Sequence, residues 1–252
     1  MPPSIPQQHA SALASRADRE SAAWRAHGRR MTDAGSIIPA VINLDHPRQG
    51  ITLDGPGSVF DTVLGLDLRA DCRLTDHWLR GADITAIYES ADPRHLRTTA
   101  MWRLHPSEGA TRTWELVVSA QTSLLQSDSV LAVVSEIDAT DILWGTCRDG
   151  AVLWHADPSP EATCVLLTRG RSAGSAGTSV LVAAHPGDAR RVTVRNDGDR
   201  VVVECWLFST ELEKGVLLRS RVLAAIGPTG NAMEWAGDVA ARFAASPPIL
   251  TT

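Results

Sequence analysis

Residues 191–207 read RVTVRNDGDRVVVECWL, and this stretch decides the fold class. Apolar and polar side chains alternate on both sides of Asp197-Gly198, which is the period of a strand with one buried face. An Asp-Gly pair supplies the positive φ angles that a tight turn between two antiparallel strands requires. The stretch therefore predicts a β-hairpin in which every second residue from Val201 to Leu207 lies on one apolar face.

Similar segments recur from Ser36 onward, where short runs rich in Val, Ile, Leu, Trp and Thr are separated by turn residues. Few helical segments lie between these runs, a pattern typical of antiparallel β-structure and not of βαβ units. We therefore predict an all-β domain over residues 36–252, a large antiparallel β-sandwich, with a barrel as the alternative. Its size and strand number are similar to those of the sandwiches in sugar mutarotases and some polysaccharide lyases, a likeness of fold that assigns no function.

Two further hairpins follow from the same signals. An Asp-Gly pair at residues 149–150 lies between the apolar runs DILWGTC and AVLWHA, which predicts a second tight turn. A longer loop joins residues 98–104 to 112–120, and pairing these segments brings Trp102 and Trp114 into one core layer. We expect the opposite face of this pair to be solvated. That face carries Met101, Arg103, Thr113 and Glu115.

A third pairing decides where we expect a ligand to bind. Residues 201–208 and 216–226 are both apolar and are separated by a short polar loop, so we predict that they pair with each other. Burying their apolar residues on one face puts charged and aromatic side chains on the other. The predicted register gives two outward pairs, Glu204 opposite Arg221 and Trp206 opposite Arg219.

The aromatic composition supports a ligand on this outer face. Eight tryptophans stand against three phenylalanines and one tyrosine. An indole ring on a sheet face offers a flat apolar surface to the C–H face of a sugar, and charged neighbours bind hydroxyl and carboxylate groups. We therefore predict that a small sugar or uronate is bound by Trp206, Glu204, Arg219 and Arg221.

Two other sets of residues could carry chemistry. His77, Arg80 and Tyr88 lie in one polar stretch and could provide acid–base catalysis on a uronic sugar. The alternation around Tyr88 predicts instead that this side chain points inward with a hydrogen-bonded hydroxyl. No phosphate-binding loop, nucleophile elbow or zinc-protease motif is present in the sequence.

A metal site is the third candidate. His155 and Asp157 are two residues apart, His185 follows, and Arg195 lies ten residues beyond it. This order resembles the two-histidine-one-carboxylate triad of Fe(II) oxygenases, in which the arginine would hold an acidic co-substrate. Apart from this divalent metal, the sequence predicts no cofactor.

The two ends of the chain differ from the strand-rich body. Residues 231–245 predict one helix, with Asn231 as N-cap and an apolar stripe from Trp235 to Phe243, and we expect it to pack across the open end of a sheet. Residues 1–35 are Pro-rich and then rich in Ala and Arg. They predict a partly disordered tail or a single docking helix, and Met31 is an alternative start of the chain.

Composition limits the partners. The formal net charge of −5 argues against a nucleic-acid-binding face, which needs clustered lysine and arginine. No apolar run is long enough to cross a membrane, and the first residues lack the pattern of a secretory signal, so we expect a cytoplasmic protein. Four cysteines without a CxxC pair fit free thiols in a reducing compartment. They are Cys72, Cys147, Cys164 and Cys205.

Three hypotheses follow. The first is an intracellular carbohydrate-recognising β-sandwich, whether binder or enzyme. The second is an interaction or structural module, a homo-oligomer among its forms, that assembles through its N-terminal tail. The third is an Fe(II)-dependent oxygenase that uses His155, Asp157 and His185.

Overall fold

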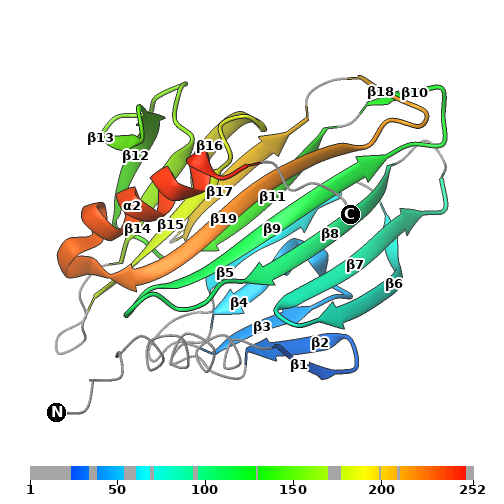
Figure 1. Ribbon diagram of the computed structural model, residues 1–252, viewed down its shortest axis with the longest axis horizontal. Helices are drawn as coiled ribbons and strands as arrows, with labels where there is room; N and C mark the ends of the chain where they lie inside the picture. Colours follow the sequence, from blue (N-terminus) through cyan, green and yellow to red (C-terminus); the bar gives the residue numbers. More distant parts are fainter. Residues whose placement is uncertain are drawn as a thin grey trace, which may run out of the picture.

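The computed structural model describes residues 24–33, 39–53, 61–68, 71–92, 96–128, 130–169, 177–198, 200–208 and 211–247. Within these residues, two large antiparallel sheets lie face to face, and one helix covers part of an outer face (Figure 1). Neither sheet closes on itself. The sandwich prediction is therefore confirmed, and the barrel alternative is wrong.

The eight-stranded sheet is called sheet A and the nine-stranded sheet is called sheet B. In spatial order, sheet A consists of β1 (Trp24–His27), β2 (Arg30–Asp33), β3 (Ala40–Asn43), β4 (Ile51–Leu53), β5 (Asp61–Asp67), β11 (Leu131–Ile137), β17 (Arg200–Leu207) and β16 (Ala189–Asp197). Sheet B consists of β13 (Ala151–His155), β12 (Asp141–Arg148), β14 (Cys164–Thr168), β15 (Thr178–Ala184), β19 (Leu218–Pro228), β9 (Arg112–Gln121), β8 (Arg97–Leu104), β7 (Asp83–Ser90) and β6 (Cys72–Arg80). The remaining elements are a two-stranded sheet of β10 (Gln126–Asp128) and β18 (Glu211–Glu213), the 3-10 helices η1 (Pro47–Gln49) and η2 (Thr229–Asn231), and α2 (Ala232–Ala245).

The local hairpin predictions are confirmed. In β16 and β17, Asp197 pairs with Arg200 around the turn at Gly198, whose φ is 63°. The turn between β12 and β13 uses positive φ angles at both of its Asp-Gly residues, as such a turn requires. β8 pairs with β9, and Trp102 and Trp114 are both fully buried between the sheets.

The predicted pairing of residues 201–208 with residues 216–226 is wrong. β17 pairs with β11 and β16 in sheet A, whereas β19 pairs with β9 and β15 in sheet B. The apolar faces of β17 and β19 do share one core, but they meet face to face across the sandwich and not side by side in one sheet. Their outward residues therefore point to opposite sides of the molecule.

Three aromatic side chains tie the sheets together by hydrogen bonds through the core. Trp102 of β8 donates from Nε1 to the carbonyl oxygen of Leu64 at 3.0 Å. Tyr88 of β7 donates from its hydroxyl to the carbonyl oxygen of Leu44 at 2.9 Å. From sheet A, Trp24 donates to the carbonyl of Ala82 at 3.1 Å. Because an unpaired buried donor is costly, these bonds favour one alignment of the sheets.

The structure corrects the prediction that residues 24–33 belong to a tail. They form a hairpin, β1 and β2, which extends sheet A through β3. Trp24 and Met31 are 3% and 2% exposed, so both belong to the core. Asp33 accepts hydrogen bonds from Nε and Nη2 of Arg112 in β9, at 3.0 and 2.5 Å, in an almost completely buried ion pair. Residues 1–23 and 34–35 of the predicted tail lie outside the described residues.

The C-terminal helix α2 forms as predicted but packs in a different place. It lies on the outer face of sheet B, over β14, β15 and β19, and not across an open end (Figure 1). Trp235, Val239 and Phe243 form the buried stripe, as the spacing predicts. Asn231 occupies the N-cap position, although its side chain makes no capping hydrogen bond.

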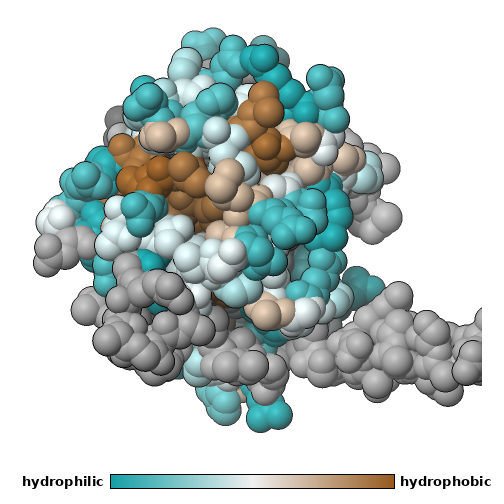
Figure 2. Space-filling view, turned by 90° about the vertical axis from the view of Figure 1, so that its left-hand side faces the viewer, coloured by the Kyte–Doolittle hydropathy of each residue, from teal (hydrophilic) through white to brown (hydrophobic). Residues whose placement is uncertain are grey.

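The side of the molecule that carries α2, β12 and β13 exposes apolar surface. Figure 2 views this side, which is at the left of Figure 1, and shows apolar residues gathered on it. Two exposed side chains from these elements are Leu153, 50% exposed, and Met233, 53% exposed. Self-association stays a prediction. The exposed apolar residues of α2 and β13 form the surface at which we expect it.

Two further sequence predictions concern membrane segments and cysteines. In the described part of the chain, no helix has the length and apolar character needed to cross a membrane. The four cysteines, all of which are described, form no disulfide with one another.

We predict that Asp33→Asn lowers the free energy of unfolding by about 3–5 kcal/mol, because it leaves the buried Arg112 without its countercharge. Urea denaturation measures this change. The control is Glu161→Gln, which removes one partner of the exposed ion pair between Arg148 and Glu161 and should cost less than about 1 kcal/mol. Equal effects of the two substitutions would show that the ion pair between Asp33 and Arg112 stabilises the fold no more than a surface contact does.

Candidate functional site

Trp206 and Glu204 lie on the outer face of sheet A, two residues apart on β17. The indole Nε1 of Trp206 donates to Thr193 Oγ1 at 3.1 Å, and the same hydroxyl donates to Glu204 Oε2 at 3.3 Å. Thr193 sits directly opposite Glu204 in β16. One threonine therefore fixes both the ring and the carboxylate, and the two side chains are held in one orientation.

Two arginines of β16 complete this group. The guanidinium of Arg191 lies 5.7 Å from the centre of the Trp206 ring, a cation–π contact. Arg195 has its Nε 3.8 Å from Glu204 Oε1 and its Nη1 3.0 Å from Asp197. These acids, with Asp197 contributing most, raise the pKa of Arg195. We call Trp206, Glu204, Thr193, Arg191 and Arg195 the platform.

Small aliphatic side chains lie beneath the platform. Ala132 and Val134 of β11 and Val202 of β17 are 1–2% exposed although they point away from the core, and Trp206 packs against them. A half-buried indole over small aliphatic residues is a flat, partly apolar surface with a charged rim. Such a surface is suited to a ligand that has both an apolar face and hydroxyl groups.

A groove of about 840 Å³ opens on the same face of sheet A. It is bounded by η1 on one side and by β5 and β11 on the other. Arg48 of η1 pairs with Asp67 of β5, and Glu136 of β11 lines the groove as well. A Cβ atom at Gly65 would overlap the carbonyl oxygen of Arg48, so glycine lets η1 lie directly on β5. The wall of the groove is thus held by backbone packing.

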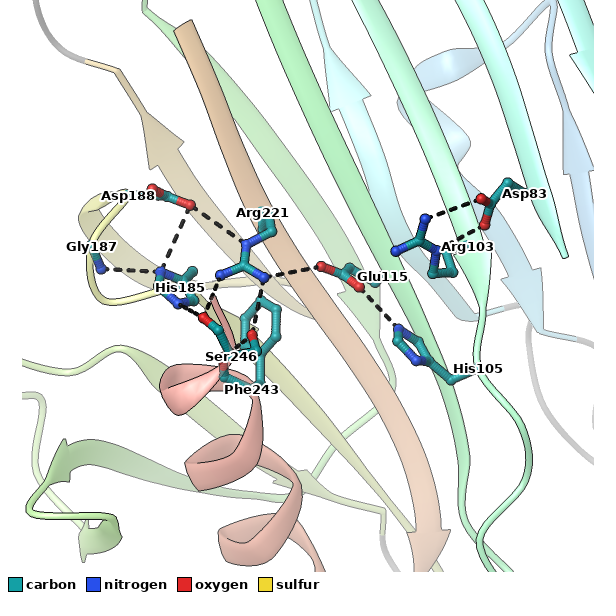
Figure 3. Close-up of polar contacts among 10 residues, drawn as sticks. All are labelled: Asp83, Arg103, His105, Glu115, His185, Gly187, Asp188, Arg221, Phe243 and Ser246. Atoms are coloured by element: carbon teal, nitrogen blue, oxygen red, sulfur yellow. Dashed lines mark hydrogen bonds and ion pairs between the residues drawn. The ribbon is translucent and has the colours of Figure 1, made fainter. Parts of the chain in front are cut away.

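Arg219 and Arg221, which the sequence placed beside Trp206, lie on the outer face of sheet B. Arg219 donates from Nε to Ser119 Oγ at 3.1 Å. Arg221 is 4% exposed and donates to the hydroxyl and the carbonyl oxygen of Ser246 at 3.0 and 3.2 Å (Figure 3). The structure therefore brings together Trp206 with Glu204 but separates both arginines from them.

The Arg221 cluster is a polar network at the C-terminal end of α2 (Figure 3). Glu115 and Asp188 lie 3.8 and 3.9 Å from Arg221, and the Phe243 ring lies 5.4 Å from its guanidinium. His185 Nδ1 accepts from the Gly187 amide, so its Nε2 carries the proton and donates to the Ser246 carbonyl at 3.3 Å. Cationic and donor groups stabilise the carbonyl end of a helix. The cluster therefore fastens α2 to sheet B.

His105 and Glu115 form a pair that the sequence did not indicate. Glu115 was expected to be solvated but is 4% exposed, because it lies between Arg221 and His105 Nε2, which is 3.0 Å away. His105 also lines a cavity of about 180 Å³ beneath the last turn of α2. A histidine oriented by a buried carboxylate is suited to proton transfer. His105 and Glu115 are close in the sequence, across the turn from β8 to β9, whereas Arg221, which buries Glu115, comes from the distant strand β19.

His77, Arg80 and Tyr88 do not converge. Tyr88 is 1% exposed and donates to Leu44, as its alternation predicts, and burial raises the pKa of its hydroxyl. His77 pairs with the inward-facing Ala86, so it lies on the inner face of the edge strand β6. Arg80 pairs with Asp83 on the opposite face. The predicted acid–base group is therefore not assembled.

His155, Asp157 and His185 cannot share a metal ion in this structure. β12 and β14 lie between β13, which ends at His155, and β15, which ends just before His185. Three strand spacings amount to about 14 Å, whereas ligands of one ion lie within about 4 Å of one another. Among the described residues, no group of three metal-ligating side chains is found. The separation of these three residues contradicts the hypothesis of an Fe(II)-dependent oxygenase.

Cys147 and Cys164 lie together beneath α2. Both belong to or border the apolar cluster under the helix, and Cys147 is only partly buried. A hydrogen bond from the Cys164 thiol lowers the pKa of Cys147 and raises that of Cys164. Of the two thiols, that of Cys147 is therefore the more acidic, and Cys147 is also the more exposed residue.

The comparisons with known proteins bear on the fold. No family model matches the chain, and no curated protein matches it significantly. The chain is similar to a glycoside hydrolase family 36 α-galactosidase from Geobacillus stearothermophilus in complex with raffinose, at 8% identity and a TM-score of 0.48, over 82% of this chain and 42% of that chain. It is also similar to a heparinase III gene product with methylated lysines, at 8% identity and a TM-score of 0.42. That match covers 85% of this chain and 35% of that chain.

A third similar structure is assigned as a kojibiose phosphorylase from the human microbiome, at 8% identity and a TM-score of 0.45. The match covers 91% of this chain and 33% of that chain. The chain thus spans less than half the length of each of these three proteins. Likenesses this distant concern strand arrangement and carry no argument about function.

We predict that Arg221→Met lowers the free energy of unfolding by about 3–5 kcal/mol, because it leaves Glu115 and Asp188 without a buried cation and removes the two hydrogen bonds from Arg221 to Ser246. Guanidinium denaturation measures the change. The matched control is Arg148→Met, since Arg148 is 59% exposed and its ion pair contributes less than about 1 kcal/mol. If both substitutions cost the same, the cluster does not hold α2 in place.

We predict that the pH midpoint for alkylation of Cys147 by iodoacetamide lies below that of an ordinary thiol and rises in Cys164→Ala. Only the thiolate reacts, and the substitution removes the donor that stabilises it. Mass spectrometry of the labelled peptide gives the rate at each pH. Cys205 is the internal reference, because burial raises its pKa to about 12 and it should stay unlabelled. A midpoint unchanged in Cys164→Ala contradicts the assignment.

Proposed function

We propose that the protein binds carbohydrate on the outer face of sheet A, with Trp206 as the stacking surface. The observation that carries this proposal is the fixed arrangement of an indole ring and a carboxylate by one threonine hydroxyl, with Trp206 Nε1 at 3.1 Å and Glu204 at 3.3 Å from Thr193. Side chains that are already held in place lose little conformational freedom when a ligand binds.

The chemistry of a sugar fits this arrangement. A pyranose presents C–H groups that bury well against a flat aromatic ring, and its hydroxyl groups donate to carboxylate oxygens. Glu204 retains 20% side-chain exposure, so its oxygens can be reached from solvent. Arg191 and Arg195 lie at the rim and can donate to ring or hydroxyl oxygens.

The proposed ligand group differs from the one that the sequence predicts. Both sets of residues contain Trp206 and Glu204. The proposed set has Arg191 and Arg195, which lie on the same face of sheet A, where the predicted set had Arg219 and Arg221. The proposed activity is recognition of the sugar.

We expect Trp206→Ala to weaken binding to a carbohydrate array by about tenfold or more, which corresponds to ~1.4 kcal/mol of lost contact. The array carries neutral and uronate-containing oligosaccharides, and affinities for the sugars that bind are then measured by calorimetry. The fold should be retained, because Trp206 is only half buried and lies outside the core between the sheets.

Two controls separate this site from the opposite face. Trp78, which is 44% exposed on β6 of sheet B, supplies a matched Trp→Ala change. Arg219→Met removes a residue that the sequence assigned to the site and the structure places on sheet B. Both variants should bind as the unaltered protein does. Binding that is insensitive to Trp206→Ala, or is lost in Arg219→Met, rejects the proposal.

A further inference from the structure

We infer that the groove between η1 and β5 is a second subsite, which holds further residues of the same glycan, and that this glycan is neutral. The inference rests on the proposed function, because it takes the platform as the first subsite. Beyond the proposed function, it states that the ligand has more than one sugar residue and that it carries no charge.

The groove and the platform lie side by side on one face. Asp67 of β5, Ala132 of β11 and Trp206 of β17 are register partners in three neighbouring strands. Asp67 lines the groove, so the groove begins about 10 Å from the tryptophan, two strand spacings away. Ala132, between them, is 2% exposed and belongs to the cluster on which Trp206 packs, so it forms no ridge between the groove and the ring. A chain of linked sugars can therefore pass from one to the other.

Glu136 makes a second connection between the two subsites. It lines the groove, and it lies diagonally across from Glu204, because Val134 pairs with Glu204 and Glu136 pairs with Val202. Diagonal neighbours in an antiparallel pair lie within about 8 Å of each other. The carboxylates thus form a continuous row of hydrogen-bond acceptors from the platform into the groove.

The groove is rigid and of suitable size. Its volume of about 840 Å³ is in the range of pockets that enclose small ligands. Its wall, η1, rests on Gly65, and Gly50, at a positive φ of 57°, also lies too close to the backbone of β5 to carry a side chain. A groove that is formed before the ligand arrives binds with a smaller ordering cost.

The charges of this face select against acidic sugars. The groove is lined by four carboxylates; Asp67 is paired with Arg48 and Asp45 is paired with Arg29, so carboxylates still outnumber guanidinium groups there. On the platform, Arg195 is likewise paired, with Asp197 and Glu204, and the guanidinium of Arg191 lies against the Trp206 ring. A uronate in the groove would meet like charge, whereas the hydroxyl groups of a neutral sugar would find acceptors. The carboxylates that line the groove are Asp45, Asp67, Asp71 and Glu136.

The test compares chain length and charge. Malto- and cello-oligosaccharides of one to four residues, and oligogalacturonates of the same lengths, are titrated into the full chain by calorimetry. Two groove variants are used: Thr52→Trp, which fills the groove, and Glu136→Gln, which removes one acceptor without changing its size. We expect affinity for a neutral series to rise about tenfold from one to three residues, and both variants to abolish the rise.

The results distinguish this inference from the proposed function. In the groove variants, affinity for the single sugar should stay within about twofold of that of the unaltered protein, while Trp206→Ala should weaken binding at every length. A length dependence that survives both groove variants overturns the second subsite, and tighter binding of oligogalacturonates overturns its charge class. Binding that Trp206→Ala leaves unchanged rejects the platform itself.

Discussion

The burial of one apolar face of sheet A against one apolar face of sheet B is the constraint on which the rest of this structure depends. It turns the polar faces of the two sheets in opposite directions, so Trp206 and Arg221 cannot meet although only the short strand β18 and its flanking residues separate β17 from β19. The hydrogen bonds that Trp102 and Tyr88 make through the core then fix how the sheets align. The two outer faces differ as a result, because the outer face of sheet B carries α2 whereas that of sheet A carries the platform and the groove.

Local features of the fold could be predicted from the sequence, because their causes lie within a few residues. Alternation identified the buried side of β17, and Asp-Gly pairs located two turns. The partner of a strand is set by contacts far away in the chain, and two apolar strands satisfy the same pattern whether they pair in one sheet or face each other across two. The hairpin at residues 24–33 was missed for a related reason, since its partners are β3 and Arg112.

The candidate site could be predicted only in part. Trp206 and Glu204 were found, because two residues of one strand with the same orientation share a face whatever the partner strand is. Arg48, Asp67 and Glu136 come from three distant segments, and nothing in their local sequence sets them apart from ordinary surface charges. Their proximity depends on η1 packing on Gly65, which is visible only once the sheet has formed.

The central claim is that the ligand lies on the outer face of sheet A. A crystal structure of the full chain with a bound neutral trisaccharide tests it most directly, because it shows which face is occupied. The account predicts one sugar ring against Trp206 and the others directed toward η1, with hydroxyl groups on Glu204 and Glu136. A trisaccharide on the outer face of sheet B, beside Arg219 or under α2, would contradict it.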